Sequence, residues 1–312
     1  MKLIFKSLIS NAATIDGARK KGKWWIAIIL GFISLIIALV PTFVHNITVK
    51  GGQYLSGNTQ GVDFAIQAFV EEAETKNYKL IVHDAGKNKA KTLEIQNFEK
   101  FEYKLPNAEE TFTIIKYEDS LTKDTIAELN TAKYDVIVFS KDSIHLRLVT
   151  SSSKDVVHTG TWAHAYDKFS NNTDLIQYFG KTYPGTRDNL IKFMDNAFDY
   201  QRVRVTWIQT GVMALVDLGV IILMGFMLWI LTRGKANPFR MYTILDGFKI
   251  VAWAALTPAI LTVALAFLLG NLPDIWFPML LGIRAMWISM KQLRPDGSGY
   301  VEQKEVKTVN VK

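Results

Sequence analysis

The stretch WWIAIILGFISLIIALVPTFV, residues 24–44, contains no charged side chain and is long enough for one helix to cross a membrane. A hydrocarbon core of roughly 30 Å requires about 20 predominantly apolar residues in a helix. Residues 205–231 and 248–269 form two further long apolar stretches, and residues 275–290 form a shorter one. Because lipid offers the backbone no hydrogen-bond partners, such stretches cross a bilayer as helices. The sequence therefore predicts an integral membrane protein with four transmembrane α-helices.

Basic residues concentrate in alternate connections between these stretches. Residues 1–23 carry six basic side chains and one acidic side chain, and residues 232–249 carry four and one. Residues 291–312 carry five and three, whereas residues 45–204 carry 20 and 22. Cytoplasmic connections of membrane proteins are enriched in Lys and Arg. This asymmetry predicts cytoplasmic N- and C-termini and an extracytoplasmic segment at residues 45–204. It explains the net charge of +7 without a nucleic-acid partner.

Such a chain has membrane lipids as a partner. The predicted layout has eight segments and one short outer turn. They are a cytoplasmic leader (1–23), a first span (24–44), an extracytoplasmic α+β domain (45–204), a second span (205–231), a cytoplasmic loop (232–247), a third span (248–269), an outer turn (270–274), a fourth span (275–290) and a cytoplasmic tail (291–312). An extracytoplasmic domain without a single cysteine is more typical of a bacterium than of an animal cell surface. We therefore expect a multi-pass protein of the bacterial plasma membrane.

The leader has the pattern of an amphipathic helix. Its apolar positions share one helical face and its lysines another, namely Ile4, Phe5, Leu8 and Ile9 against Lys2 and Lys6. Such a helix lies in the interface of a membrane. The pattern predicts a helix on the cytoplasmic leaflet, with a frayed terminus as the alternative.

The segment at residues 45–204 alternates between helical and strand patterns. Helical spacing of apolar residues occurs at residues 63–76, 120–131 and 174–200. Strand patterns occur at residues 78–83, 101–105, 111–117, 134–140 and 143–150, and the last two are close enough for a hairpin. These patterns predict a small α+β domain with a mixed or antiparallel sheet. Because no Pro or Gly interrupts residues 186–210, one helix is able to run from this domain into the second span.

Residue types that support catalysis or metal binding are sparse. The chain has no cysteine, and its five histidines are scattered, so we expect surface histidines, no metal and no cofactor. The spacing of His158 and His164 fits no helical zinc motif. There is no nucleophile elbow and no dinucleotide fingerprint. The sequence thus predicts a protein that is not an enzyme.

Two charges inside the predicted spans are the candidate site residues. Asp217 lies about nine residues inside the second span, and Arg284 lies nine residues beyond Ile275. At about 1.5 Å per residue, both are roughly 14 Å from the outer face. Charges within a membrane are costly unless they are paired or hydrated. We therefore predict an intramembrane ion pair between Asp217 and Arg284, which either fixes the register of the two spans or belongs to a proton or substrate relay.

The beginning of the chain resembles a known group of proteins. Residues 3–8 (LIFKSL), followed by residues 19–23 (RKKGK) and a long first span, are similar to a family of uncharacterised Gram-positive membrane proteins, some labelled maltodextrin-utilisation protein. Residues 134–142 (YDVIVFSKD) resemble a strand and turn in the outer segment of that family. The resemblance implies a bacterial plasma-membrane protein connected with carbohydrate uptake or the envelope. It implies no catalytic residues.

Three functions are compatible with this layout. The first is a non-enzymatic accessory or scaffold subunit of a transport or envelope complex, whose extracytoplasmic domain binds a protein partner or a ligand. The second is a transmembrane sensor that couples this domain to the cytoplasm through the long helix before residue 231. The third is a small transporter that uses Asp217 and Arg284, although few other polar residues are available to extend a pathway.

Overall fold

The computed structural model describes residues 2–19, 24–55, 61–84, 86, 89–104, 111–149, 155–182, 184–234, 237–269 and 273–293. Much of the predicted cytoplasmic tail and of the predicted outer turn lies outside these residues, as do residues 20–23 of the leader. The chain forms two compact units. The helical unit comprises Met1–Asn46 and Thr206–Lys312, and the sheet unit comprises Ile47–Val205.

The chain contains three helices that are long and apolar enough to cross a membrane, counted over the described residues. They are α3 (Trp24–Thr48), α7 (Gly185–Leu231) and α8 (Ile244–Leu269). Helix α9 (Pro273–Gln292) covers the fourth predicted span but is less apolar, because it contains Arg284 and Lys291. The chain therefore combines candidate membrane-spanning helices with a separate sheet unit.

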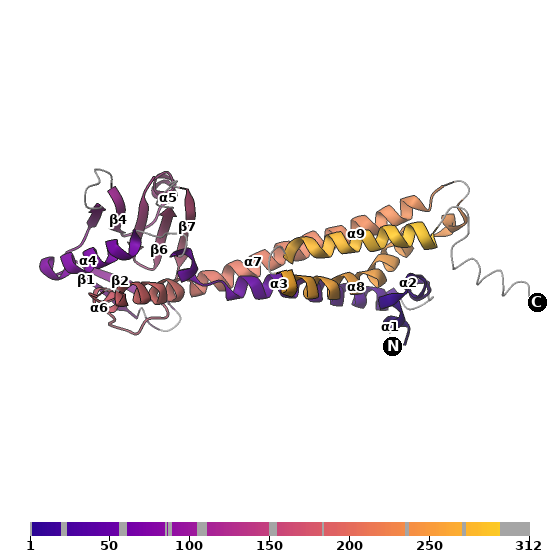
Figure 1. Cartoon of the computed structure of the whole chain (residues 1–312), viewed down its shortest axis with the longest axis horizontal. Coiled ribbons are helices and arrows are strands. Elements are labelled where there is room, and N and C mark those ends of the chain that lie inside the picture. The colour runs from indigo at the N-terminus through magenta and orange to yellow at the C-terminus, as the bar shows by residue number, and fades with distance from the viewer. Residues whose placement is uncertain are drawn as a thin grey trace, which may run out of the picture. The chain divides into compact units, whose positions relative to one another are not determined.

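Helix α8 is the centre of the helical unit. The most apolar 18-residue stretch of α8 is 56% buried, whereas the corresponding stretches of α3 and α7 are 39% and 22% buried. It packs against α9 and against two short leader helices, α1 (Lys2–Ile9) and α2 (Asn11–Ala18), which lie beside it in Figure 1. The shared core contains Ile15 of α2, Trp253 of α8 and Leu281 of α9.

Glycines bring α7 and α8 close together. A Cβ at Gly225 would collide with Phe248, and a Cβ at Gly247 would collide with the backbone of Gly225. Small residues at such positions permit the close helix contacts that are common in membrane proteins. The connection between the two helices includes a short 3-10 helix, η2 (Pro238–Met241).

The sheet unit is an α+β structure with a mixed five-stranded sheet in the order β3-β4-β5-β6-β7. Its strands are β3 (Lys100–Lys104), β4 (Thr111–Glu118), β5 (Asp135–Ser140), β6 (Ser143–Val149) and β7 (Val156–Ala163). Among the described strands only β4 and β5 are parallel, with Ile115 beside Ile137. A parallel pair needs a crossover connection, which α5 (Lys123–Leu129) provides. The predicted hairpin of β5 and β6 is confirmed by their antiparallel register.

A second, two-stranded sheet precedes the large one. It pairs β1 (Lys79–His83) with β2 (Thr92–Gln96) and follows α4 (Val62–Lys76). Asn77 ends α4 in the left-handed conformation at φ 56°, which Asn tolerates better than most residues. Short helices η1 (Gly51–Leu55) and α6 (Leu175–Phe179) complete the unit, and Asp174 caps α6 by accepting from the Ile176 N–H.

The core of the sheet unit lies between one face of the large sheet and helices α4, α6 and α7. Its buried side chains include Phe69 of α4, Phe139 of β5, Trp162 of β7 and Phe179 of α6. The opposite face is covered by α5, where Leu129 packs on Val136 and Val138.

Helix α7 is 47 residues long and contributes to both cores. Near its beginning, Phe193 and Met194 are buried in the core of the sheet unit. Near its end, Leu228 is buried in the core of the helical unit. The prediction of one uninterrupted helix across residues 186–210 is confirmed.

Candidate functional site

The guanidinium of Arg284, near the middle of α9, is surrounded by oxygens. Its Nη1 donates to the backbone oxygen of Ala254 at 2.8 Å. Its Nη2 donates to the backbone oxygen of Ser7 and, at 3.3 Å, to Thr14 Oγ1. A longer contact of 3.4 Å joins Nε to Asn11 Oδ1. Four neutral oxygens of its own chain thus surround this cation.

Two of these oxygens belong to carbonyls that helix geometry leaves without a donor. Pro258 lies within α8 and has no N–H for the carbonyl four residues earlier, which is that of Ala254. Ser7 lies in the last turn of α1, where carbonyls have no partner within the helix. The C-terminal end of a helix also carries partial negative charge, which favours a cation. Arg284 therefore satisfies the Ala254 carbonyl, which would otherwise be costly to bury, and shares the Ser7 carbonyl with the Thr14 hydroxyl, which donates to it at 3.3 Å.

The same contacts fasten the leader to α8 and α9. Thr257 Oγ1 on α8 donates to the backbone oxygen of Leu8 at 2.8 Å. Ile15 is fully buried. Gly17 lies so close to Trp253 that a Cβ would stand 2.7 Å from the ring. The leader is therefore packed against protein, where the sequence predicted a helix on the membrane surface.

The predicted apolar face of the leader is divided between two environments. Ile4 and Leu8 pack against the core of the helical unit. Phe5 and Ile9 are exposed on its surface. The division follows from the break at Ser10, which starts a second helix and caps it by accepting from the Ala13 N–H.

The structure does not contain the predicted ion pair between Asp217 and Arg284 within the part of the chain that it describes. Asp217 is buried on α7, and the hydrogen bonds of Arg284 go to the leader and α8. Equal depth in two helices does not determine which faces meet. The Arg284 side chain turns to α1, α2 and α8, whereas it is Gly282 of α9 that lies against α7, at Met224.

The sheet unit has a cleft of about 530 Å³, lined by both apolar and polar side chains, where β4 and β5 end. Its walls combine hydroxyl, carboxylate and ammonium groups, including Lys89, Asp119, Ser140, Asp142, Ser143 and Thr161. Ser140 Oγ donates to the backbone oxygen of Asp119 at 3.3 Å. Such a mixture of donors and acceptors suits a polar ligand or a polar protein surface. No sequence pattern predicts this cleft, because its residues come from four separate segments.

Two histidines that were predicted on the surface are instead buried or half-buried. His145 is fully buried, and its Nδ1 lies 3.0 Å from Thr161 Oγ1. Burial, followed by the charge of Arg147, lowers the pKa of His145. His158 stacks on Tyr54 and accepts from Trp162 Nε1 at 3.2 Å. Burial, with a smaller effect of His145, lowers the pKa of His158 to about 4. Both rings are therefore neutral at pH 7.

Metal chemistry has no support among the described residues, where no three His, Cys, Asp or Glu side chains gather into a group that could hold an ion. No protein-family model, curated protein or solved structure matches this chain. The function is therefore inferred from the geometry of Arg284, the leader and the cleft.

Proposed function

We propose that the chain is a non-enzymatic accessory or scaffold subunit of a transport or envelope complex in a bacterial plasma membrane. Four helices cross the membrane, both termini are cytoplasmic, and the sheet unit is extracytoplasmic and binds a protein partner or ligand. The bacterial origin and a role in carbohydrate uptake are proposed from the resemblance of residues 3–8 and 19–23. The orientation is proposed from the basic residues that flank the helices.

The length and packing of α9 support a fourth span. Its 20 residues extend about 30 Å, which matches the hydrocarbon core. It is separated from the end of α8 by only residues 270–272 and packs against that helix. The main obstacle is the charge of Arg284, and its hydrogen bonds to oxygens of α1, α2 and α8 reduce the cost of that charge.

The scaffold proposal rests on one observation: most of the hydrogen-bond donors of Arg284 already have acceptors within the chain. A transport pathway needs polar groups that are free to exchange partners with a solute. Four of the five guanidinium N–H groups are already directed at oxygens of the same chain. The most polar site among α1, α2, α8 and α9 thus serves to hold the leader on the bundle, as expected of an anchor and assembly surface.

The cleft at the ends of β4 and β5 is the place where we propose that the partner binds. In the test, the full-length chain is crosslinked in cells and purified in mild detergent. The variant Lys89→Glu with Asp142→Lys reverses two exposed charges of the cleft without changing the net charge. The matched control, Glu128→Lys with Lys133→Glu, reverses two exposed charges in and after α5.

We expect one companion protein with the wild type and the control, and its loss with the cleft variant. Equal recovery with both variants would place the partner elsewhere. Purification without a companion would contradict the scaffold proposal. Solute flux by the purified chain alone in vesicles would favour the transporter instead.

Helix α7 supports a sensor as the second candidate. Partner binding on the sheet unit would then alter the reactivity of a cysteine at Leu231, at the end of the same helix. Inserting three glycines after Arg202 should abolish this response, since glycine disfavours helix. Inserting seven alanines instead keeps the helix continuous and adds about two full turns, so that the residues after the insertion keep their orientation and the response should persist. A response that survives the glycines would exclude coupling through α7.

A further inference from the structure

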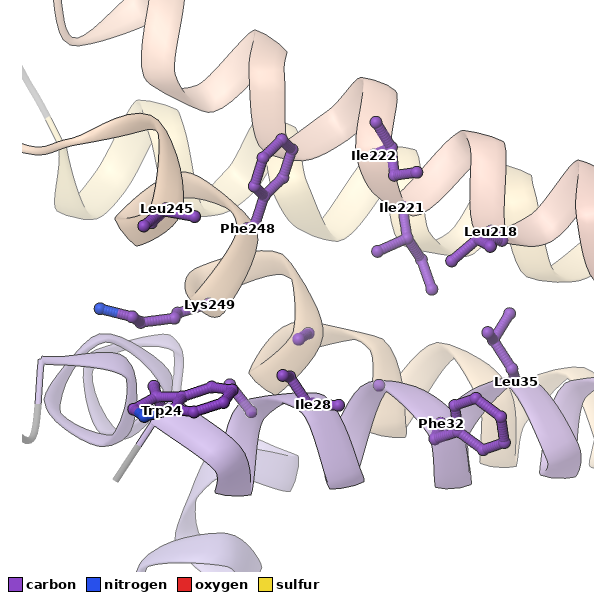
Figure 2. Close-up of a pocket in the computed structure, with 13 residues that line it drawn as sticks. Trp24, Ile28, Phe32, Leu35, Leu218, Ile221, Ile222, Leu245, Phe248 and Lys249 are labelled. Carbon is purple, nitrogen blue, oxygen red and sulfur yellow. The ribbon is translucent and has the colours of Figure 1, made fainter. Parts of the chain in front are cut away.

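A groove of about 630 Å³ lies among α3, α7 and α8 within the helical unit. Figure 2 shows side chains from the three helices directed into one common space. Its walls are almost entirely hydrocarbon, including Ile28, Phe32, Leu35, Leu218, Ile221 and Phe248. The volume falls within the range of about 300–1,000 Å³ that is typical of ligand sites.

Small residues on facing helices give the groove its depth. Gly31 of α3 lies against Ala252 of α8, so that a Cβ at Gly31 would stand 3.5 Å from that of Ala252. Both residues line the groove, together with Ala27. The larger side chains at the edges of the groove remain exposed: Phe32 is 66% and Ile28 is 56% exposed. In a membrane-spanning helix, an open apolar wall of this kind faces lipid.

One end of the groove is polar. Lys249 and Trp24 lie there together, whereas Leu35 and Leu218 lie at the other end (Figure 2). The Lys249 ammonium is 3.0 Å from Asp246 Oδ1, which neutralises one charge. Lys and Trp side chains favour the headgroup layer of a membrane.

Further cations surround the connection that leads into this end of α8. Arg233 donates to the backbone oxygen of Tyr242, and the Arg19 guanidinium lies 5.9 Å from the centre of the Tyr242 ring. With Lys249, three cations lie near this connection, together with the carboxylates of Asp246 and of Asp16, which precedes Arg19 by three residues. This balance favours an anionic headgroup over a zwitterionic one.

We infer that the groove binds one acyl chain of an anionic phospholipid. The chain lies along α8 between α3 and α7, and the phosphate lies at the end that carries Lys249. Hydrocarbon walls retain the chain, and the basic end selects the headgroup. This site requires that the helical unit is in a membrane, but it does not depend on the partner of the sheet unit.

The test compares phosphatidylglycerol and phosphatidylcholine on the full-length chain, delipidated in detergent and measured by native mass spectrometry. Ile28→Trp fills the groove from an exposed wall position. Ile36→Trp places the same bulk on an exposed position of α3 that does not line the groove. Lys249→Gln removes the cation at the polar end.

We expect the wild type to prefer phosphatidylglycerol by about fivefold, which is the effect of one basic residue near a membrane surface. Lys249→Gln should reduce this preference, and Ile28→Trp should reduce binding of both lipids, with Ile36→Trp unchanged. Equal binding of the two lipids by the wild type, or equal losses with the two tryptophan variants, would overturn the inference.

A second measurement uses the wild-type chain, so that it does not depend on the folding of a variant. Phosphatidylglycerol with a diazirine in its acyl chain is photolysed on the protein, and the crosslinked residues are mapped. The groove predicts crosslinks at Phe32 and Ile222 in excess of those at Ile36 and Leu215, which are exposed outside it. An even distribution over all four residues would also overturn the inference.

Discussion

Replacing Arg284 by Met should release the leader from the helical unit. Methionine has a similar length but donates no hydrogen bond, so four acceptors lose a donor. At about 0.6 kcal/mol for an average hydrogen bond in a membrane protein, four bonds amount to roughly 2.5 kcal/mol. Since about 1.4 kcal/mol is a tenfold change in an equilibrium, the released population should rise roughly 60-fold.

The absence of native cysteines makes this release measurable. Ala18→Cys places a single thiol in α2 at a position that is only 6% exposed. Its reaction with a maleimide reports the released state, and the rate in SDS-unfolded protein provides the reference. Arg284→Met should raise the labelling rate by the same factor as the released population.

A matched variant calibrates the scale. Thr257→Val removes only the hydrogen bond to the Leu8 carbonyl, so it should raise labelling about threefold. If Arg284→Met accelerates labelling no more than Thr257→Val, the guanidinium does not hold the leader. Arg284→Lys should fall between Arg284→Met and the wild type, because an ammonium cannot reproduce the planar fork of a guanidinium.

Two further predictions concern packing and pH. Gly17→Leu should expose the Ala18→Cys thiol at least as much as Arg284→Met does, because no side chain fits between α2 and the Trp253 ring; wild-type labelling rates would contradict this close approach. The pKa of His158 is about 4 in the folded chain, against the ordinary value of 6.5 for a histidine in the unfolded chain. Between pH 6.5 and pH 4 the unfolded chain therefore binds more protons than the folded chain. Stability should fall as the pH decreases through this range. Partial solvent screening should limit the loss to about 1–2 kcal/mol, measured as the change in unfolding free energy between pH 7 and pH 5. His158→Gln should flatten this dependence and His164→Asn should not; equal slopes for the two variants would refute the assignment.

The long helices could be predicted because their signals are local. The apolar stretch at residues 24–44 predicts α3 directly. The lack of Pro and Gly at residues 186–210 predicts that α7 is continuous. The hairpin of β5 and β6 follows from two β-branched runs separated by Lys141 and Asp142. The strand β7 was missed, because its residues VVHTGTWA do not alternate clearly between polar and apolar types.

The environment of Arg284 could not be predicted because it depends on backbone carbonyls. Neither Ser7 nor Ala254 reveals from its side chain that its carbonyl accepts from a guanidinium. One signal was available: Pro258 leaves the Ala254 carbonyl without its helical donor, which marks a position where an external donor binds. Pairing Asp217 with Arg284 relied on depth alone and lacked this information.

The burial of His145 was hidden by the pattern of its own strand. In SIHLRLV the positions of Ile, Leu and Leu alternate with those of His and Arg, which is typical of a strand with one solvated face. The face that carries His145 and Arg147 is covered by the segment around α5, and Arg147 Nε donates to the Ala132 carbonyl at 2.6 Å. A crossover connection in a mixed sheet thus buried residues that their own strand pattern marked as exposed.

The contact between the two ends of the chain has a consequence for biosynthesis. The leader is translated long before α9, because Arg284 follows Ser7 by 277 positions. At about 5–20 residues per second, the ribosome needs roughly 15 to 55 s to cover this interval. During that time the binding site of the leader lacks Arg284, even once Trp253 and Thr257 of α8 have been synthesised. A chain that stops before α9 would hold its leader by α8 alone, so firm docking of the leader marks a chain that contains α9.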